Sequence, residues 1–221
     1  VGSTDPLYGI YLTTAAELTP ARERIPHRNT LYRNLGGWKF KDVSKEAGVD
    51  LEAWGSGACV GDVDGDGRLD LYVTNWGPNV LFRNRGNGTF ENVAARAGVT
   101  AGGWSTGCTF FDADGDGDLD LYVARYVETT WDSVQRARRS LVWRNGPSIM
   151  VGPAGLPGEP DLFFENLGNG QFKEATAAHG FSDSTRAYGF AVLATDYDDD
   201  GLVDLFVAND SNPNFLYHNL G

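Results

Sequence analysis

Three acidic loops of nine residues recur along the chain, at 62–70, 112–120 and 196–204. Each loop carries aspartate at positions one, three, five and nine, and glycine at position six. Carboxylates at this density repel one another unless a cation lies among them. The fold must therefore present the same loop repeatedly, each time in a place where the loop can enclose a cation.

The spacing of the carboxylates matches the oxygen ligands that calcium prefers. Calcium accepts about six to eight oxygens in flexible geometry, and alternating aspartates with one main-chain carbonyl commonly supply them. Glycine at position six permits the tight reversal of the loop, because it has no Cβ to oppose a positive φ. In the third loop, Asp199 replaces the glycine at position four. The predicted ligands of three Ca²⁺ sites, with a main-chain carbonyl at position seven, are Asp62, Asp64, Asp66, Arg68 and Asp70; Asp112, Asp114, Asp116, Asp118 and Asp120; and Asp196, Asp198, Asp200, Leu202 and Asp204.

The residue at position twelve argues against an EF-hand. An EF-hand needs glutamate there, between two helices, whereas this chain has Val73, Val123 and Val207. Each loop instead runs into a β-branched and aromatic segment such as 69–73, which is typical of a strand. Magnesium fits less well because it requires a tighter octahedral shell. An acidic turn without an ion remains the alternative to calcium.

The loops lie within a longer repeat whose unit consists of four short strands. Asp62 and Asp112 are 50 residues apart, and an insertion lengthens the next interval to 84. Short strands and Asn-Gly turns without a long amphipathic pattern indicate an all-β repeat, and units of about 40–50 residues are typical of propeller blades. We therefore predict an all-β fold, a β-propeller of four-stranded antiparallel blades; a sandwich or parallel β-helix fits less well. The strands of the best-defined unit are predicted at 55–61, 69–74, 79–83 and 89–93.

Further motifs support a family resemblance. A Leu-Tyr-Arg-Asn signature or a close variant ends at Asn34, Asn84, Asn166 and Asn219, with Gly-rich turns behind it and Ala-Gly-Val turns at 47–49 and 97–99. With the acidic loops, these motifs over about residues 29–221 resemble FG-GAP or VCBS repeats, the propeller blades of integrin α-subunits. They are more closely similar to the cartilage acidic protein group and its ASPIC/UnbV-type bacterial relatives. Residues 151–158 also resemble a segment of that group, with Val151 in place of its cysteine.

The chain contains about three and a half to four blades within a single propeller domain at 1–221. The first unit lacks its opening strand, with strands expected at 7–12 and within 30–43, and the last unit stops after Asn219. Propellers close with about four to eight blades, and unpaired strand edges invite aggregation. We therefore expect part of a larger propeller, or an assembly in which neighbouring chains complete the open blades.

The formal charge of −12 reflects the acidic loops, whose predicted side-chain ligands carry as many negative charges. Three divalent cations would leave about −6. This acidity argues against nucleic acid as a partner, and no stretch has the apolar length of a membrane span. Calcium modules of modest affinity, about 10⁻⁴ to 10⁻³ M, fill only where calcium is plentiful. We therefore expect an extracellular or periplasmic location.

Several recurrent residues are assigned structural roles. Cys59 and Cys108 occupy equivalent strands one position out of register, so they should point to opposite faces. Free thiols are expected rather than a disulfide. The aromatic residues at 54, 104 and 188 are expected to fill gaps between blades, and the recurrent asparagines to bond main chain at strand ends.

The insertion at 125–160 departs from the repeat. A helical face is predicted from Trp131 to Leu141, and five arginines make this the only basic region: Arg125, Arg136, Arg138, Arg139 and Arg144. Long inserted loops on rigid scaffolds often carry function. The insertion is interpreted as a cap over one propeller face, with a ligand or partner site as the alternative.

The leading functional hypothesis is a calcium-stabilised extracellular structural or adhesive module. Its partner would be a protein or glycan, and self-association through open blade edges is a version of the same hypothesis. The histidines occupy unrelated points of the repeat, and no nucleophile elbow, zinc-type His pair or phosphate loop occurs. The alternative is an enzyme or biosynthetic accessory factor, as ASPIC/UnbV-like relatives imply, with its site in the channel or under the insertion.

Overall fold

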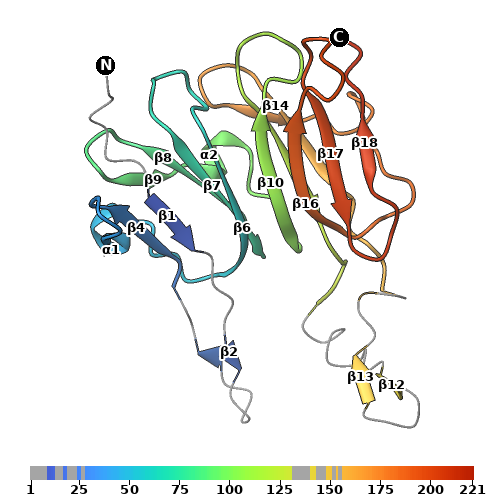
Figure 1. The fold of residues 1–221 in the computed structure, drawn as a ribbon, viewed down its shortest axis with the longest axis horizontal. Coiled ribbons are helices and arrows are strands. Elements are labelled where there is room, and N and C mark those ends of the chain that lie inside the picture. The colour runs from blue at the N-terminus through green and yellow to red at the C-terminus, as the bar shows by residue number, and fades with distance from the viewer. Residues whose placement is uncertain are drawn as a thin grey trace.

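The computed structural model describes residues 9–12, 17–18, 24–25, 28–130, 140–142, 148–150, 153 and 156–221. This part of the chain is all-β. Four antiparallel sheets stand side by side in chain order, from blue to red in Figure 1. The predicted fold class is confirmed: the sheets are blades of the expected type. No sheet of the described residues closes on itself into a barrel.

Blades 2 and 3 each contain four strands in consecutive spatial order. The predicted strands of the second unit agree with the observed ones to within about two residues. Blade 2 consists of β6 (Trp54–Gly61), β7 (Asp70–Trp76), β8 (Val80–Asn84) and β9 (Phe90–Asn92). Blade 3 consists of β10 (Ser105–Phe111), β11 (Asp120–Arg125), β14 (Leu162–Asn166) and β15 (Phe172–Glu174).

Blades 1 and 4 have three strands each among the described residues. Blade 1 consists of β1 (Gly9–Leu12), β4 (Thr30–Asn34) and β5 (Phe40–Asp42). Blade 4 consists of β16 (Gly189–Thr195), β17 (Asp204–Asn209) and β18 (Phe215–Tyr217). β4 and β8 share the Asn-terminated signature, so β4 is the third strand of its blade. β1, which pairs with β4, therefore corresponds to β7. Within the described ranges, blade 1 therefore has no counterpart of the inner strand β6, and blade 4 has none of the outer strand β9.

The Ala-Gly-Val motifs end two short helices rather than forming simple turns. Helix α1 spans Ser44–Ala47 and α2 spans Ala94–Ala97. Each helix ends at a glycine in the left-handed conformation, Gly48 at φ 74° and Gly98 at φ 82°. Glycine is favoured there because it has no Cβ to oppose this conformation.

The hydrophobic core lies between the blades. Alternate residues of one strand point to opposite faces of its sheet, so a central strand such as β7 contributes to two clusters. On β7, Tyr72 packs in a cluster with Leu121 and Phe164 of blade 3. Its neighbours Leu71 and Val73 pack on the other face, in the cluster that Leu31 of blade 1 joins. A third cluster joins blades 3 and 4.

Two further hairpins lie outside the blades. One pairs β2 (Glu17–Leu18) with β3 (Arg24–Ile25), and the other pairs β12 (Ser140–Val142) with β13 (Ser148–Met150). Leu141, the last residue of the predicted helical face, lies in a strand, so the helix prediction is wrong at this end. Residues 131–139, 143–147 and 151–152, with four of the five arginines and Val151, lie outside the described residues.

Across the described ranges, every helix is too short and too polar to traverse a lipid bilayer.

Candidate cation-binding loops

Each acidic loop connects the first two strands of its blade, as predicted. The loops lie between β6 and β7, between β10 and β11, and between β16 and β17. These strand pairs are antiparallel, so each loop is a hairpin end whose position is set by the strands on both sides. The same local geometry is thus repeated in three blades.

The aspartate at position one organises the main chain of its own loop. The carboxylate of Asp62 accepts hydrogen bonds from the main-chain N–H of Asp66 at 3.1 Å and of Gly67 at 2.7 Å. Asp112 and Asp196 make the corresponding bonds to Gly117 and Gly201. A carboxylate held in this way curls the loop and faces its interior.

The left-handed conformations are the same in the three loops. The glycines at position six have φ of 82°, 92° and 90°. At position four, Gly65 and Gly115 have φ of 68° and 76°, and Asp199 of the third loop adopts 61°. Asp199 therefore follows the same turn as the glycines, since aspartate tolerates this conformation better than most residues.

The aspartate at position nine is buried and joins the loop to the third strand of the blade. Asp70 accepts the N–H of Val63 at 3.1 Å and the N–H of Asn84 at 2.8 Å. Asp120 and Asp204 accept the equivalent pairs of N–H groups. Burial raises the pKa of both Asp70 and Asp120 to about 6. The N–H of Asn219 lowers the pKa of Asp204.

The carboxylates converge in each loop, but not all four predicted side chains meet in one group. Ligand atoms lie within 4.8 Å of one another in four groups: Asp62, Asp64 and Asp66; Asp112, Asp114 and Asp120; Asp196, Asp198 and Asp204; and Asp198, Asp200 and His218. Positions one and three belong to such a group in every loop. Asp70 and Asp116 stand outside these groups, as do Arg68, Asp118 and Leu202, for which only the main-chain carbonyl was predicted.

The first loop contains a buried carboxylate oxygen without a partner. The side chain of Asp64 is 7% exposed, and its Oδ1 has no hydrogen-bond partner. Its other oxygen pairs with Arg83 of β8, and Asp66 pairs with Arg68. Burial raises the pKa of Asp64, and the Arg83 charge acts in the opposite direction. An unsatisfied buried oxygen is costly, and a cation bound in the loop would satisfy it.

Sequence analysis gave no functional role to the residue that precedes the recurrent asparagine. This position is Arg83 in blade 2, Glu165 in blade 3 and His218 in blade 4. Arg83 contacts the first loop, and Nδ1 of His218 lies 3.2 Å from Asp204 in the third. Among the described residues, no ion pair includes a carboxylate of the second loop. An alignment of the four signatures could have identified this position, because its residue varies in charge between blades while the other residues of the signature do not.

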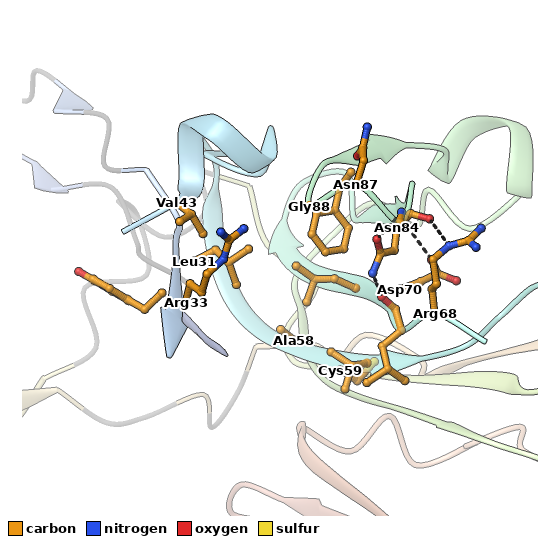
Figure 2. A pocket seen from close by; sticks show the side chains of 16 residues that line it. Leu31, Arg33, Val43, Ala58, Cys59, Arg68, Asp70, Asn84, Asn87 and Gly88 are labelled. Atoms are coloured by element: carbon orange, nitrogen blue, oxygen red, sulfur yellow. Dashed lines mark hydrogen bonds between the residues drawn. The ribbon is translucent and has the colours of Figure 1, made fainter. Parts of the chain in front are cut away.

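A cavity of about 690 Å³ lies between blades 1 and 2, lined by residues of β4, β6 and the first acidic loop (Figure 2). Arg33 and Arg68 approach it from opposite sides. Nε of Arg68 donates to the carbonyl of Asn84 at 3.2 Å. The cavity adjoins the blade in which the described residues provide no inner strand, and Val60 of β6 is 58% exposed there.

The fold and loops define a repeat protein of propeller blades, three of which carry an acidic loop between their first two strands. Residues 21–73 and 62–123 match the family model described as FG-GAP-like repeat, so the chain is similar to two such repeats over this part of its length. A search of curated proteins found no match. The match concerns the repeat and does not extend to the closer resemblance to cartilage acidic proteins.

Proposed function

We propose that this chain is a calcium-binding structural module of an extracytoplasmic propeller, in which one ion per acidic loop holds the geometry of its blade. The main support is the repeated loop geometry. In each loop, main-chain N–H groups anchor the aspartates at positions one and nine, while the position-three carboxylate approaches position one. The partnerless Oδ1 of Asp64 adds an acceptor that only a donor or a cation can satisfy.

A bound calcium ion would supply positive charge and would accept carboxylate and carbonyl oxygens as ligands. The residues at positions one, three and five would hold it, with the carbonyl at position seven. Position nine would contribute in the second and third loops, where Asp120 and Asp204 lie within the groups. Because the ion binds the folded loop and not the unfolded chain, its binding free energy stabilises the fold.

The three loops are expected to differ in affinity. Arg83 neutralises part of the first loop, and protonated His218 would do the same in the third. The second loop has five aspartates, as does the third, but it has Glu165 at this position instead of a cationic residue. Ligand charge raises calcium affinity. The second loop should therefore bind calcium most tightly of the three, and the first loop should bind it less tightly than the second.

Calcium titration of chelator-treated protein by isothermal titration calorimetry tests the proposal, with thermal unfolding measured in parallel. We expect one ion per loop and a marked fall in Tm on chelation. Asp114→Asn should remove one binding equivalent. Asp118→Asn, which keeps the position-seven carbonyl, should retain it. No heat of binding at millimolar calcium, together with an unchanged melt on chelation, would reject the proposal.

The affinity order has its own test. Arg83→Ala should raise the affinity of the first loop, because it removes the guanidinium that pairs with Asp64. Arg85→Ala is the matched control, since Arg85 pairs with Glu91 and not with the loop. Equal affinities in both variants and in the wild type would show that Arg83 does not compete with the ion.

Extracellular or periplasmic location and a protein or glycan partner belong to the same proposal. Exposed apolar side chains on the inner strand of blade 2 and on blade 4 support such association. Val60 is exposed beside blade 1, and Leu193 and Leu216 of blade 4 are 59% and 52% exposed. In an assembly completed across subunits, deletion of residues 214–221 should abolish association in analytical ultracentrifugation. A truncated chain that sediments like the wild type would exclude this version.

A further inference from the structure

The inner strands β6 and β10 of neighbouring blades approach closely at two levels. A Cβ added to Gly57 would lie 2.5 Å from the carbonyl oxygen of Thr106. A Cβ added to Gly61 would lie 3.0 Å from Cδ2 of the Phe110 ring. Cys59 lies midway between Gly57 and Gly61 on β6, two positions from each, and Cys108 lies midway between Thr106 and Phe110 on β10. The strand geometry therefore brings the two cysteines opposite each other.

The two thiols share one environment. Both side chains are half-buried and pack against the cluster between blades 2 and 3 that contains Tyr72, Leu121 and Val99. Both are free thiols in this structure. Burial raises the pKa of Cys59, and the adjacent thiol of Cys108 raises it further. The second effect requires the sulfur atoms to lie within interaction range of each other.

The offset of one position explains why the cysteines meet. Sequence analysis predicted correctly that they occupy opposite faces of equivalent strands, and for that reason expected free thiols. Propeller blades pack face to face, however, so the far face of blade 2 meets the near face of blade 3. Residues on opposite faces of successive blades therefore converge.

We propose that Cys59 and Cys108 form a redox pair that closes into a disulfide between blades 2 and 3 when a small-molecule or protein disulfide is available as oxidant. One cysteine thiolate attacks a sulfur of the oxidant and releases its first thiol, leaving a mixed disulfide on the protein. The second thiolate attacks the protein sulfur of that mixed disulfide and releases the second thiol. The two protein thiols lose two protons and two electrons, and the oxidant is reduced to two thiols.

This closure suits the proposed extracytoplasmic location, where disulfides persist, but it does not depend on calcium. The disulfide would close a chain segment of 49 residue steps between its two sulfurs. Such a cross-link should raise Tm by about 5–15 °C in a domain of this size. Thiolate is the attacking species, and burial raises the pKa of Cys59. The folded protein should therefore oxidise more slowly than the refolding chain.

The proposal is tested on the full chain by two treatments. In one, the chain is refolded in a glutathione redox buffer; in the other, the folded protein is incubated with oxidised glutathione. We expect thiol titration to fall from two thiols to none, a loss of about 2 Da, and a peptide linking positions 59 and 108 in non-reducing mass spectrometry. Tm should rise by the amount given above and return on reduction.

Cys59→Ser and Cys108→Ser provide the controls. Each variant should keep the wild-type circular dichroism spectrum, show no linked peptide, and melt at the same temperature with and without oxidant. The proposal is overturned by two free thiols after both treatments, by glutathione adducts without the internal link, or by disulfides between chains only. None of these outcomes bears on calcium binding, so the two proposals fail independently.

Discussion

The side-chain amide of Asn166 donates a hydrogen bond to the main-chain carbonyl of Val63 at 3.0 Å, which joins the third strand of blade 3 to the acidic loop of blade 2. The same amide donates to the carbonyl of Leu119 in its own blade, also at 3.0 Å. Asn219 repeats the arrangement one blade later, with Ala113 as the partner at 2.8 Å. The residue at position two of the first and second loops therefore connects its blade to the next one by a hydrogen bond.

Asn166→Ala should lower the free energy of unfolding by about 1–3 kcal/mol, because it leaves buried carbonyls without a donor. Asn84→Ala is the matched comparison. The side-chain amide of Asn84 donates to Leu69 of its own blade, so loss of this amide should affect one blade rather than the contact between blades. Urea denaturation measures both. Equal losses in the two variants would show that the bond between blades adds nothing.

Trp76→Ala should destabilise the contact between blades 2 and 3. The Trp76 ring stacks on Trp104 with centroids 5.7 Å apart and meets Trp54 edge-on at 5.3 Å. The rings are half-buried, so the expected cost is about 2–4 kcal/mol, from lost apolar burial and ring contacts. Trp38→Ala is the control, since Trp38 is 96% exposed and its loss should change Tm little. Similar Tm values for the two variants would contradict the packing role.

Gly57→Ala should separate β6 from β10 locally. The added methyl group would lie 2.5 Å from the carbonyl oxygen of Thr106 and 3.1 Å from the hydroxyl of Thr74. Overpacking of this kind costs about 1–3 kcal/mol. Gly102→Ala, with no atom within 4 Å of the added Cβ, should be nearly neutral. Thermal unfolding of both variants is the measurement. An unchanged Tm for Gly57→Ala would show that β6 and β10 can move apart without loss of stability.

Asp161 should make stability fall as pH rises from about 4 to 7. The pKa of Asp161 is raised to about 7, mainly by burial and also by the charge of Asp183, although the N–H of Arg125 and the hydroxyl of Tyr122 act in the opposite direction. In this window the folded protein holds a proton that the unfolded chain has released, so increasing pH favours unfolding. The stabilisation of the fold by Asp161 is fully present below about pH 4, and it is lost as the pH rises through 7.

The measurement is the difference in unfolding free energy between the wild type and Asp161→Asn across this range. Asparagine carries no titrating proton, so the wild type should lose stability relative to the variant as pH rises. The acidic loops titrate in both proteins and cancel in the difference. A difference that stays constant from pH 4 to 7 would show that folding does not raise the pKa of Asp161.

Much of one blade could be predicted from local spacing. The strands of blade 2, the loop between its first two strands and the main-chain role of the asparagines follow from short-range patterns that the structure confirms. The helix predicted up to Leu141 is wrong at that residue, because an amphipathic period over so few residues also fits a hairpin. The local pattern could not show that Arg83 lies on Asp64, since β8 and the loop meet only after the sheet forms.

Short-range patterns in the chain specify the blade and its acidic loop, because turn chemistry, strand alternation and carboxylate spacing act between residues close in the chain. Which side chains of different blades meet depends on how the sheets pack. Asn166 reaches Val63, and Cys59 faces Cys108, because successive sheets stack face to face in a particular register. That register arises from the packing of whole sheets, and no short segment of the chain specifies it alone.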